Sequence, residues 1–469
     1  GHIHLRQADH DHSCDYYEQS LTVARELNDL RLISQNLEGL GDVAAFQSDF
    51  VKANVYYQES LEINRRIDHK RGIAGNLNGI GWVASSQSDY ETCRRCFEQS
   101  LEIAQEIGDR RGVARSMGNL GAIASAQGNF ATALAYYQQQ LQIHRETGLK
   151  AGIAWSLWAL SRLMFFQGDY AAASEQNLQS LAINRELGDK TYLSANLRVL
   201  GQIAYAQGDY PAARRYQDES LALAQEIGQQ LGITAGYIFL GQISAAMGEW
   251  ADTQFYFDQG LALTRDLNFM DGIADSLNGL GWTALCRGAY ALARTHFEEA
   301  LAVARQITYV DGIATILIRL GLLAAATHDY AAAADYYHES LDLARRLGLQ
   351  HQIASALVRL GLLELDQQVW PTAYAHLIEG LRLANTIGAQ PVMLEALIGL
   401  AEYFLAQGEI DRSLELAAVA HSHPALAAGI VRSRLDAVTP REGAAEASPA
   451  ASLNSVVCAL LDPSAHSAR

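Results

Sequence analysis

The sequence contains little proline, few cysteines and no long apolar run. Only 7 prolines occur in 469 residues, and because proline disrupts helix interiors, this scarcity favours an almost entirely helical chain. The 5 cysteines are scattered, without the spacing of a disulfide framework, which indicates a reducing, cytoplasmic compartment. Apolar runs all fall short of the roughly 18 residues that suggest a membrane-spanning helix, so no membrane segment is expected.

Basic residues and catalytic signatures are also missing. The chain has 35 Lys+Arg against 52 Asp+Glu, a formal net charge of -17 at pH 7. A nucleic-acid interface needs the opposite sign, so direct nucleic-acid binding by this segment is not expected. The sequence has no G-x-x-x-x-G-K-[ST] phosphate loop, no H-E-x-x-H and no G-x-S-x-G. We therefore expect a protein that is not an enzyme and needs no cofactor.

A repeat of 40 residues fills most of the sequence. Within residues 71–110, Leu77, Ile80 and Ala84 lie at helical spacing, and an Asp89-Tyr90 turn precedes a second apolar helical face. The glycine at position 81 recurs at the same interval in Gly41, Gly121, Gly201, Gly241, Gly281, Gly321 and Gly361. An unbroken register between residues 21 and 410 indicates tandem two-helix units.

This register predicts three parts of the chain. Residues 1–28 align with the end of a unit, so we expect a truncated half repeat cut from a longer protein. Residues 29–424 hold ten full units, each with a helix A, a short turn and a helix B. For residues 425–469 we predict a further helix over 425–437, a Pro/Ala/Glu-rich linker and a short apolar helix over 453–461. This last helix either caps the open end of the solenoid or lies in its groove.

The turns and the mid-helix glycines have predicted roles. Gly168-Asp169-Tyr170 is typical of the turns, with a left-handed glycine ending helix A and an aspartate capping helix B. The glycine inside helix A costs about 1 kcal/mol relative to alanine, so we expect it to admit a close neighbour. Alanines on helix B are predicted to form the matching flat surface: Ala133, Ala173, Ala213, Ala293, Ala333 and Ala373.

The residue order within a unit (Leu, Leu-Gly, Gly-x-Tyr, Ala, Phe/Tyr, Ala-Leu) resembles the tetratricopeptide repeat, lengthened from about 34 residues. This resemblance implies an all-α, right-handed superhelix, an α-solenoid of helix-turn-helix repeats. The long unit, with "SLxIAxExGD" helix ends, is similar to the C-terminal sensor regions of bacterial STAND signal-transduction ATPases, including transcriptional activators of the maltose-regulator (MalT-like) type. There an upstream ATPase module responds when the repeats bind an inducer or partner. Comparable repeats also serve as constitutive peptide-binding scaffolds.

The resemblance also implies that helix A lines the concave groove. Its groove positions in this sequence carry indole, guanidinium, amide and phenol groups, and Trp and Arg are frequent binding anchors. We predict that these residues bind a peptide, protein or small-molecule inducer: Asn78, Trp82, Arg115, Trp155, Trp158, Arg162, Arg198, Gln202, Tyr205, Asn278 and Trp282. Alternatively, the tryptophans fill gaps between repeats where Ser161 replaces glycine. The solenoid could also self-associate, directly or through an upstream ATPase module that is not part of this sequence.

Other patterns have simpler interpretations. The single Cys93-x-x-Cys96 pair is predicted to pack between helices rather than to bind a metal, and the N-terminal histidines (His2, His4, His10, His12) are not expected to form a native metal site. Paired tyrosines on helix B are predicted to be core: Tyr56, Tyr57, Tyr136, Tyr137, Tyr336 and Tyr337. In the C-terminal half the groove positions are apolar: Ile318, Leu322, Val358, Leu362, Leu365 and Ile398. We expect them to hold an amphipathic helix, and residues 453–461 of the same or another copy are the candidate.

Overall fold

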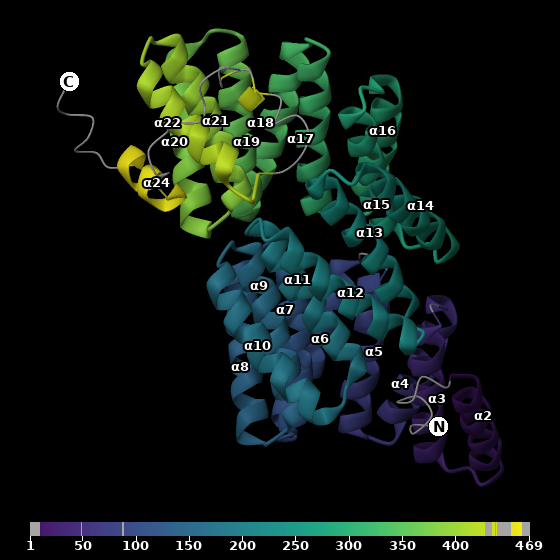
Figure 1. Ribbon diagram of the computed structural model, residues 1–469. Helices are drawn as coiled ribbons and strands as arrows, with labels where there is room; N and C mark the ends of the chain where they lie inside the picture. The colour runs from purple at the N-terminus through teal and green to yellow at the C-terminus, as the bar shows by residue number, and fades with distance from the viewer. Residues whose placement is uncertain are drawn as a thin grey trace. The chain divides into compact units, whose positions relative to one another are not determined.

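The computed structural model describes residues 10–47, 49–86, 89–426, 434–436, 438 and 452–461, and in these residues every regular element is a helix (Figure 1). The predicted all-α solenoid of tandem repeats is confirmed. The A helices are α3 (Leu30–Phe46), α5 (Lys70–Ser86), α7 (Arg110–Ala126), α9 (Lys150–Phe166), α11 (Lys190–Ala206), α13 (Gln230–Met247), α15 (Met270–Cys286), α17 (Val310–Ala326), α19 (Gln350–Asp366) and α21 (Gln390–Ala406).

The B helices alternate with them along the chain. They are α2 (His10–Glu26), α4 (Phe50–Arg66), α6 (Tyr90–Glu106), α8 (Phe130–Glu146), α10 (Tyr170–Leu187), α12 (Tyr210–Glu226), α14 (Trp250–Asp266), α16 (Tyr290–Gln306), α18 (Tyr330–Leu347), α20 (Trp370–Ile387) and α22 (Ile410–Ser422). None of the described helices is long and apolar enough to cross a membrane. The chain divides into two compact units, residues 1–163 (unit 1) and residues 164–469 (unit 2), with the boundary inside α9.

The turn chemistry follows the sequence prediction. Gly168 and Gly208 have φ values of +79° and end their A helices in the left-handed conformation. The carboxylates of Asp169 and Asp209 then accept backbone hydrogen bonds at the starts of α10 and α12. Glu249, in the corresponding position before α14, makes no such side-chain cap bond. The turns are therefore fixed locally, and most repeats keep the same helix lengths.

In most repeats the mid-helix glycine makes room for an aromatic ring of helix B. The ring of Phe257 on α14 lies between two A helices, where a Cβ at Gly241 would come within 2.9 Å of it and a Cβ at Gly279 within 2.2 Å. Tyr57 lies in the same way between Gly41 and Gly79. The rings of Tyr137, Phe297 and Tyr337 likewise face Gly121, Gly281 and Gly321, where an alanine contact was predicted, so that prediction is wrong there. Gly201 and Gly361 lie against the backbone oxygens of Ala213 and Ala373, so the predicted alanine contact is confirmed in these two repeats.

The paired tyrosines divide into two kinds. Tyr57, Tyr137 and Tyr337 are buried, as predicted. The preceding tyrosines are only half-buried: Tyr56, Tyr136 and Tyr336. Cys93 and Cys96 are buried as free thiols, and burial raises the pKa of Cys93 to about 11. These cysteines pack between helices, as the sequence indicated. His2 and His4 lie outside the described residues, as do the side chains of His10 and His12.

The superhelix of unit 2 brings together repeats that are far apart in sequence. At the turn before α10, a Cβ on Gly168 would lie 2.6 Å from Ile387 Cγ2 at the end of α20. The Tyr170 hydroxyl and His351 Nδ1 are 3.2 Å apart. One repeat later, the Tyr210 hydroxyl donates a hydrogen bond of 3.3 Å to the carbonyl of Ala425. The solenoid of unit 2 therefore closes on itself.

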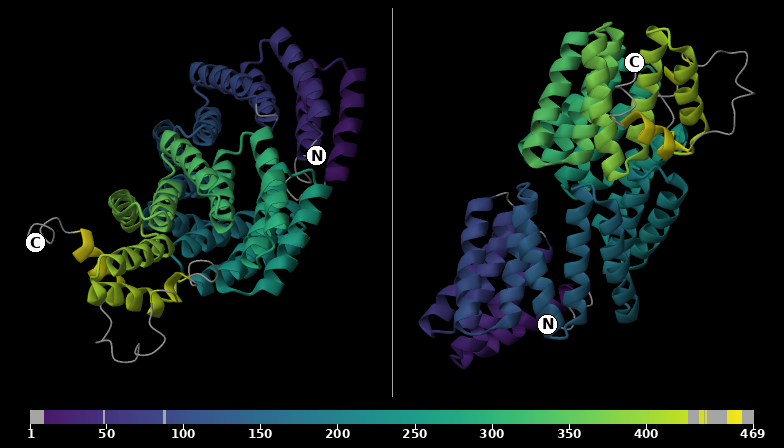
Figure 2. Two further views of the ribbon diagram at one scale, coloured as in Figure 1. Left: turned by 90° about the horizontal axis from the view of Figure 1, so that it is seen from above. Right: turned by 90° about the vertical axis from the view of Figure 1, so that its left-hand side faces the viewer.

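The C-terminal segments pack against unit 2. Helix α24 (Leu453–Leu461), yellow in Figure 2, contacts α20 and α22 rather than lying in the groove. In the segment predicted as a further helix, residues 434–436 and 438 are helical. Arg434 forms ion pairs with Asp366 and with Glu402 (3.6 Å) and contacts the Leu362 carbonyl.

The apolar positions that were predicted to line an open groove are mostly buried in this structure. Five of its positions are buried: Leu322, Val358, Leu362, Leu365 and Ile398. Leu435 is fully buried next to Arg434. The expectation that residues 453–461 of this copy fill the groove is wrong, because these residues form α24, which contacts α20 and α22 instead.

Candidate ligand-binding cavity

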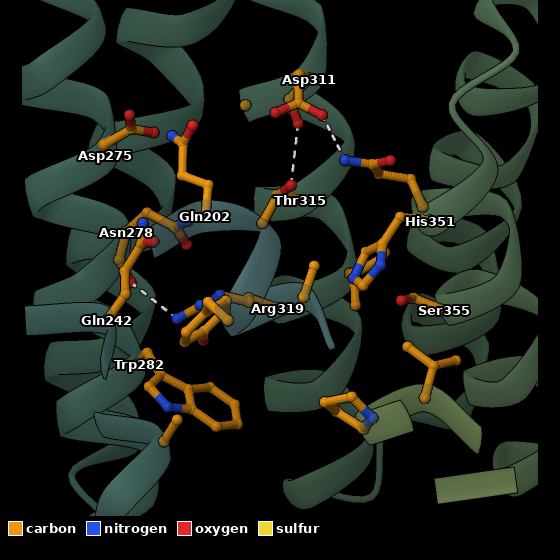
Figure 3. Close-up of a pocket in the computed structure, with 18 of the residues that line it drawn as sticks. Gln202, Gln242, Asp275, Asn278, Trp282, Asp311, Thr315, Arg319, His351 and Ser355 are labelled. Atoms are coloured by element: carbon orange, nitrogen blue, oxygen red, sulfur yellow. Dashed lines mark hydrogen bonds between the residues drawn. The ribbon is translucent and has the colours of Figure 1, made fainter. Parts of the chain in front are cut away.

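The superhelix of unit 2 surrounds a partly open cavity of ≈ 430 Å³ (Figure 3). Its wall consists mainly of A helices, α11 to α21, which present equivalent positions of the 40-residue repeat to the same space. Three such sets line it: Asp275, Thr315, Ser355 and Glu395; Gln202, Gln242, Trp282 and Leu322; and Asp311, His351 and Pro391. Because each repeat contributes a different side chain at the same geometric position, the cavity is chemically asymmetric.

One end of the cavity is acidic. The Tyr309 hydroxyl donates to Asp275 Oδ2 at 3.4 Å, and Gln352 Nε2 donates to Asp311 Oδ1. Figure 3 shows the Asp275 and Asp311 side chains at the same end of the site. Burial, with the nearby charges of Asp311 and Asp271, raises the pKa of Asp275 to about 7. Burial also raises the pKa of Asp311 to about 6, against the opposing effect of the Gln352 hydrogen bond.

Arg319 occupies the middle of the cavity. Its guanidinium lies over the Trp282 ring, 4.8 Å from the ring centroid, and donates a hydrogen bond of 3.5 Å to the Asn278 carbonyl. Burial lowers the pKa of Arg319. Asn278 is buried, and its side-chain Oδ1 has no hydrogen-bond donor among the described residues. This region therefore offers unused N–H donors and an unused acceptor.

Other polar groups of the cavity wall already have partners within the protein. Arg359 and Glu395 form an ion pair of 2.7 Å with both side chains largely buried. His351 lies against Tyr170, and burial lowers the pKa of His351 to about 4, so the imidazole is neutral near pH 7. No hydrogen bond joins Ser355 to His351 in the described residues.

The cavity contains four of the eleven predicted groove residues: Gln202, Tyr205, Asn278 and Trp282. Tyr205 packs on Tyr210 and Phe239, with ring centroids about 5.5 Å apart. The side-chain amides of Gln202 and Gln242 make no hydrogen bond within the described part of the chain. Arg198 belongs to unit 2 but does not line this cavity.

The other predicted residues belong to unit 1. Asn78 is buried, and its amide nitrogen donates to the Ala74 carbonyl and to Ser100 within the stack. Trp82 is exposed and contacts Phe50 edge-on, with ring centroids 5.9 Å apart. Arg115 lines a separate depression in unit 1. Ligand binding by these residues stays a prediction.

Trp155, Trp158 and Arg162 form a connected group on α9. Trp155 packs edge-on against Tyr137 (6.0 Å) and lies 6.4 Å from Trp158, while the Arg162 guanidinium is 5.0 Å from the Trp158 centroid. Both indoles are partly exposed and Arg162 is exposed. The group therefore combines inter-helix packing with an accessible surface.

Sequence reasoning did not select Asp311, Arg319 and His351 as ligand contacts. Asp311 and His351 lie in the first turn of their A helices, and they reach the cavity because the superhelix of unit 2 closes. Asp275, Thr315, Ser355 and Glu395 occupy the same position of successive repeats, and this spacing could have predicted that they line one wall.

Comparisons with known proteins agree with this architecture. Family models described as tetratricopeptide repeats match residues 1–66, 73–146, 118–186, 153–226 and 273–308. No match was found among curated proteins.

Several solved structures have the same fold. A Rap protein complexed with competence and sporulation factor has a TM-score of 0.57 and 11% identity, over 79% of this chain and 100% of that one. The Rap conjugation gene regulator of plasmid pLS20, in complex with the Phr* peptide, has a TM-score of 0.52 and 15% identity, over 61% and 78%. The apo quorum sensor NprR from B. thuringiensis has a TM-score of 0.50 and 14% identity, over 72% and 99%. At these identities the likeness concerns the fold alone. Since the repeat models together match more than half of its residues, this chain belongs to the tetratricopeptide-repeat family.

Proposed function

We propose that this chain is a non-enzymatic binding module that takes a short peptide or a small molecule into the cavity of unit 2. The observation that carries the proposal is the cavity of unit 2, where equivalent repeat positions present different polar groups. Its volume of ≈ 430 Å³ lies within the usual range for small-ligand sites, about 300–1,000 Å³. The unbonded amides of Gln202 and Gln242 suit a ligand with its own donors and acceptors.

A peptide is the favoured ligand class. Two of the structurally similar proteins are a Rap protein in complex with competence and sporulation factor and a Rap regulator in complex with the Phr* peptide. A peptide backbone offers both N–H donors and carbonyl acceptors, which match the unused groups at Asn278 and Arg319. These points support a peptide site in unit 2.

We further propose that the module is the sensor region of a STAND-type signal-transduction regulator. In that context, ligand binding to the closed superhelix would shift the balance between inactive and active states of an upstream ATPase module and promote assembly. The alternative is a constitutive scaffold for protein assembly. The exposed Trp82 and the Trp158–Arg162 pair of unit 1 favour this alternative, because such groups anchor protein partners. A phosphate loop in the longer protein would support the sensor.

Replacing Trp282 with alanine is expected to reduce peptide binding at least about tenfold. The substitution removes an indole of the cavity wall and the surface on which Arg319 lies. The probe is an equimolar pool of unmodified random tetrapeptides, and the peptides retained by the protein are quantified by mass spectrometry after gel filtration.

Two variants serve as controls. Phe255→Ala removes an exposed aromatic ring of α14 that does not line the cavity, and it should leave retention unchanged. Trp158→Ala/Arg162→Ala tests whether the aromatic group on α9 takes part in binding. If the wild-type protein retains no peptide, or if Trp282→Ala retains as much as wild type, the proposed function is wrong.

A further inference from the structure

We propose that the cavity selects a peptide that carries a cationic group, which lies between Asp275 and Asp311, and a carboxylate, which binds Arg319. This inference rests on the proposed function and adds the charge pattern of the ligand. It follows from the charged groups of the cavity wall, where some carboxylates have an ion-pair partner and others do not.

The cavity wall contains three acidic and two basic side chains. Glu395 is satisfied by Arg359, at 2.7 Å. No Lys or Arg forms an ion pair with Asp275 or Asp311 within the described residues. Both carboxylates therefore face the cavity without the partner that Glu395 has.

The surroundings of the two carboxylates do not supply that charge. Asp275 receives a hydrogen bond from Tyr309 and Asp311 one from Gln352, which are neutral donors. The charged groups nearby are Asp271, which adds to the repulsion, and Arg319, which lies over Trp282. Burial is the main cause of the raised pKa values of both carboxyl groups, and the charge of Arg319 opposes it only at Asp275. A ligand ammonium or guanidinium would form charge-assisted hydrogen bonds here.

An independent observation at Asn278, one helical turn from Asp275 on α15, indicates further ligand contacts. Asn278 is 6% exposed, lines the cavity and has an Oδ1 with no donor in the described part of the chain. Leaving a buried acceptor unsatisfied is costly, so a ligand N–H is expected there. Arg319 donates one hydrogen bond, to the Asn278 carbonyl, and a guanidinium has five N–H groups.

Together these groups define the ligand. An ordinary peptide N–H of the ligand would donate to Asn278 Oδ1. A carboxylate of the ligand, from a side chain or the peptide C-terminus, would accept from Arg319. The cation at the acidic end is a lysine or arginine side chain or the peptide N-terminus. A short zwitterionic peptide carries all three, whereas a polyamine lacks the carboxylate and an acidic peptide with a blocked N-terminus lacks the cation.

The test uses the full chain and the random tetrapeptide pool, together with a second pool whose N-termini are acetylated. In the acetylated pool, retained peptides should be enriched at least about fivefold in lysine or arginine. Asp275→Asn/Asp311→Asn should abolish this enrichment. Asp335→Asn/Asp342→Asn, which removes the same charge from exposed positions of α18, should keep it.

A pH series and a folding measurement complete the design. For the most enriched acetylated peptide, affinity should fall at least about tenfold between pH 7.5 and pH 5, because Asp275 and Asp311 become protonated over this range. The Asn/Asn variant should show no such fall. Its thermal unfolding temperature should equal or exceed that of wild type at pH 7.5, because the variant lacks two poorly compensated buried charges, so any loss of binding will not result from unfolding.

The outcomes separate the two proposals. If peptides are retained without lysine or arginine enrichment, or if the Asn/Asn variant keeps the enrichment, the charge assignment is wrong and the peptide-binding function stands. If no peptide from either pool is retained, the proposed function fails and the charge assignment fails with it.

Discussion

Replacing Gly279 with valine is expected to destabilise unit 2 by about 2–4 kcal/mol, because overpacking a filled core forces side chains and backbone to move. A Cβ at this position would lie 2.2 Å from the ring of Phe257, which is 1% exposed and is confined on its other side by Gly241. The branched side chain of valine has no space to avoid the ring. The expected result is a lower urea midpoint in unfolding followed by circular dichroism.

A double-mutant cycle with Phe257→Leu tests the cause. The smaller side chain opens space for valine, so the double variant should be more stable than the sum of the single effects predicts. Ala331→Val on the exposed face of α18 serves as the control for the helix propensity of valine, with a cost below about 1 kcal/mol. If Gly279→Val unfolds at the wild-type midpoint, the ring does not fill the space between the helices as described.

Gly208→Ala is expected to cost about 2–4 kcal/mol, at least about twice the cost of Gly288→Ala. Both glycines have left-handed backbones, with φ of +79° and +73°, so both substitutions introduce similar backbone strain of about 1–2 kcal/mol. Only Gly208 lies against another repeat, because a Cβ there would come within 2.3 Å of Ala425 Cβ and 3.2 Å of its Cα. The difference between the two variants therefore measures the contact that closes unit 2.

The measurement is urea unfolding of the two variants under identical conditions. Gly408→Ala provides a second control, since φ is +84° and no atom lies within 4 Å of its Cβ position. Equal losses of stability in all three variants would show that Gly208 does not contact Ala425 in solution. The Gly208 variant should also retain less peptide, because the closing contacts border the cavity at Tyr210.

The local structure of this protein could be predicted from its sequence. Gly168 and Asp169 specify the end of one helix and the start of the next, and they do so with backbone conformations and cap bonds that involve only nearby residues. The role of the mid-helix glycine was harder to infer. The rings of Tyr137, Phe297 and Tyr337 occupy space that alanine was expected to leave flat. Deciding between a ring and an alanine required the distance between neighbouring helices.

The cavity could be predicted only in part. Gln202, Asn278 and Trp282 were identified because they occupy groove positions within single helices. Asp311 and His351 enter the site through the closure of the superhelix, which depends on small rotations summed over successive repeats. No local pattern in the sequence specifies that sum. The same limit applies to Arg434, whose partners on α19 and α21 lie at a sequence separation of up to 72 residues.

The closure of unit 2 is tested most directly by a disulfide between Gly168→Cys and Ile387→Cys, in a chain whose own exposed Cys458 is replaced by serine. The Cβ position at Gly168 lies 3.0 Å from Ile387 Cβ, close enough for a disulfide to form after a small adjustment, since linked Cβ atoms are about 3.5–4.5 Å apart. After mild oxidation, mass spectrometry of the digested protein should show the peptides containing positions 168 and 387 joined in most molecules, and neither single variant should form this link. If both thiols stay free while the protein remains folded, the superhelix of unit 2 is open, and the cavity on which the proposed function depends does not exist.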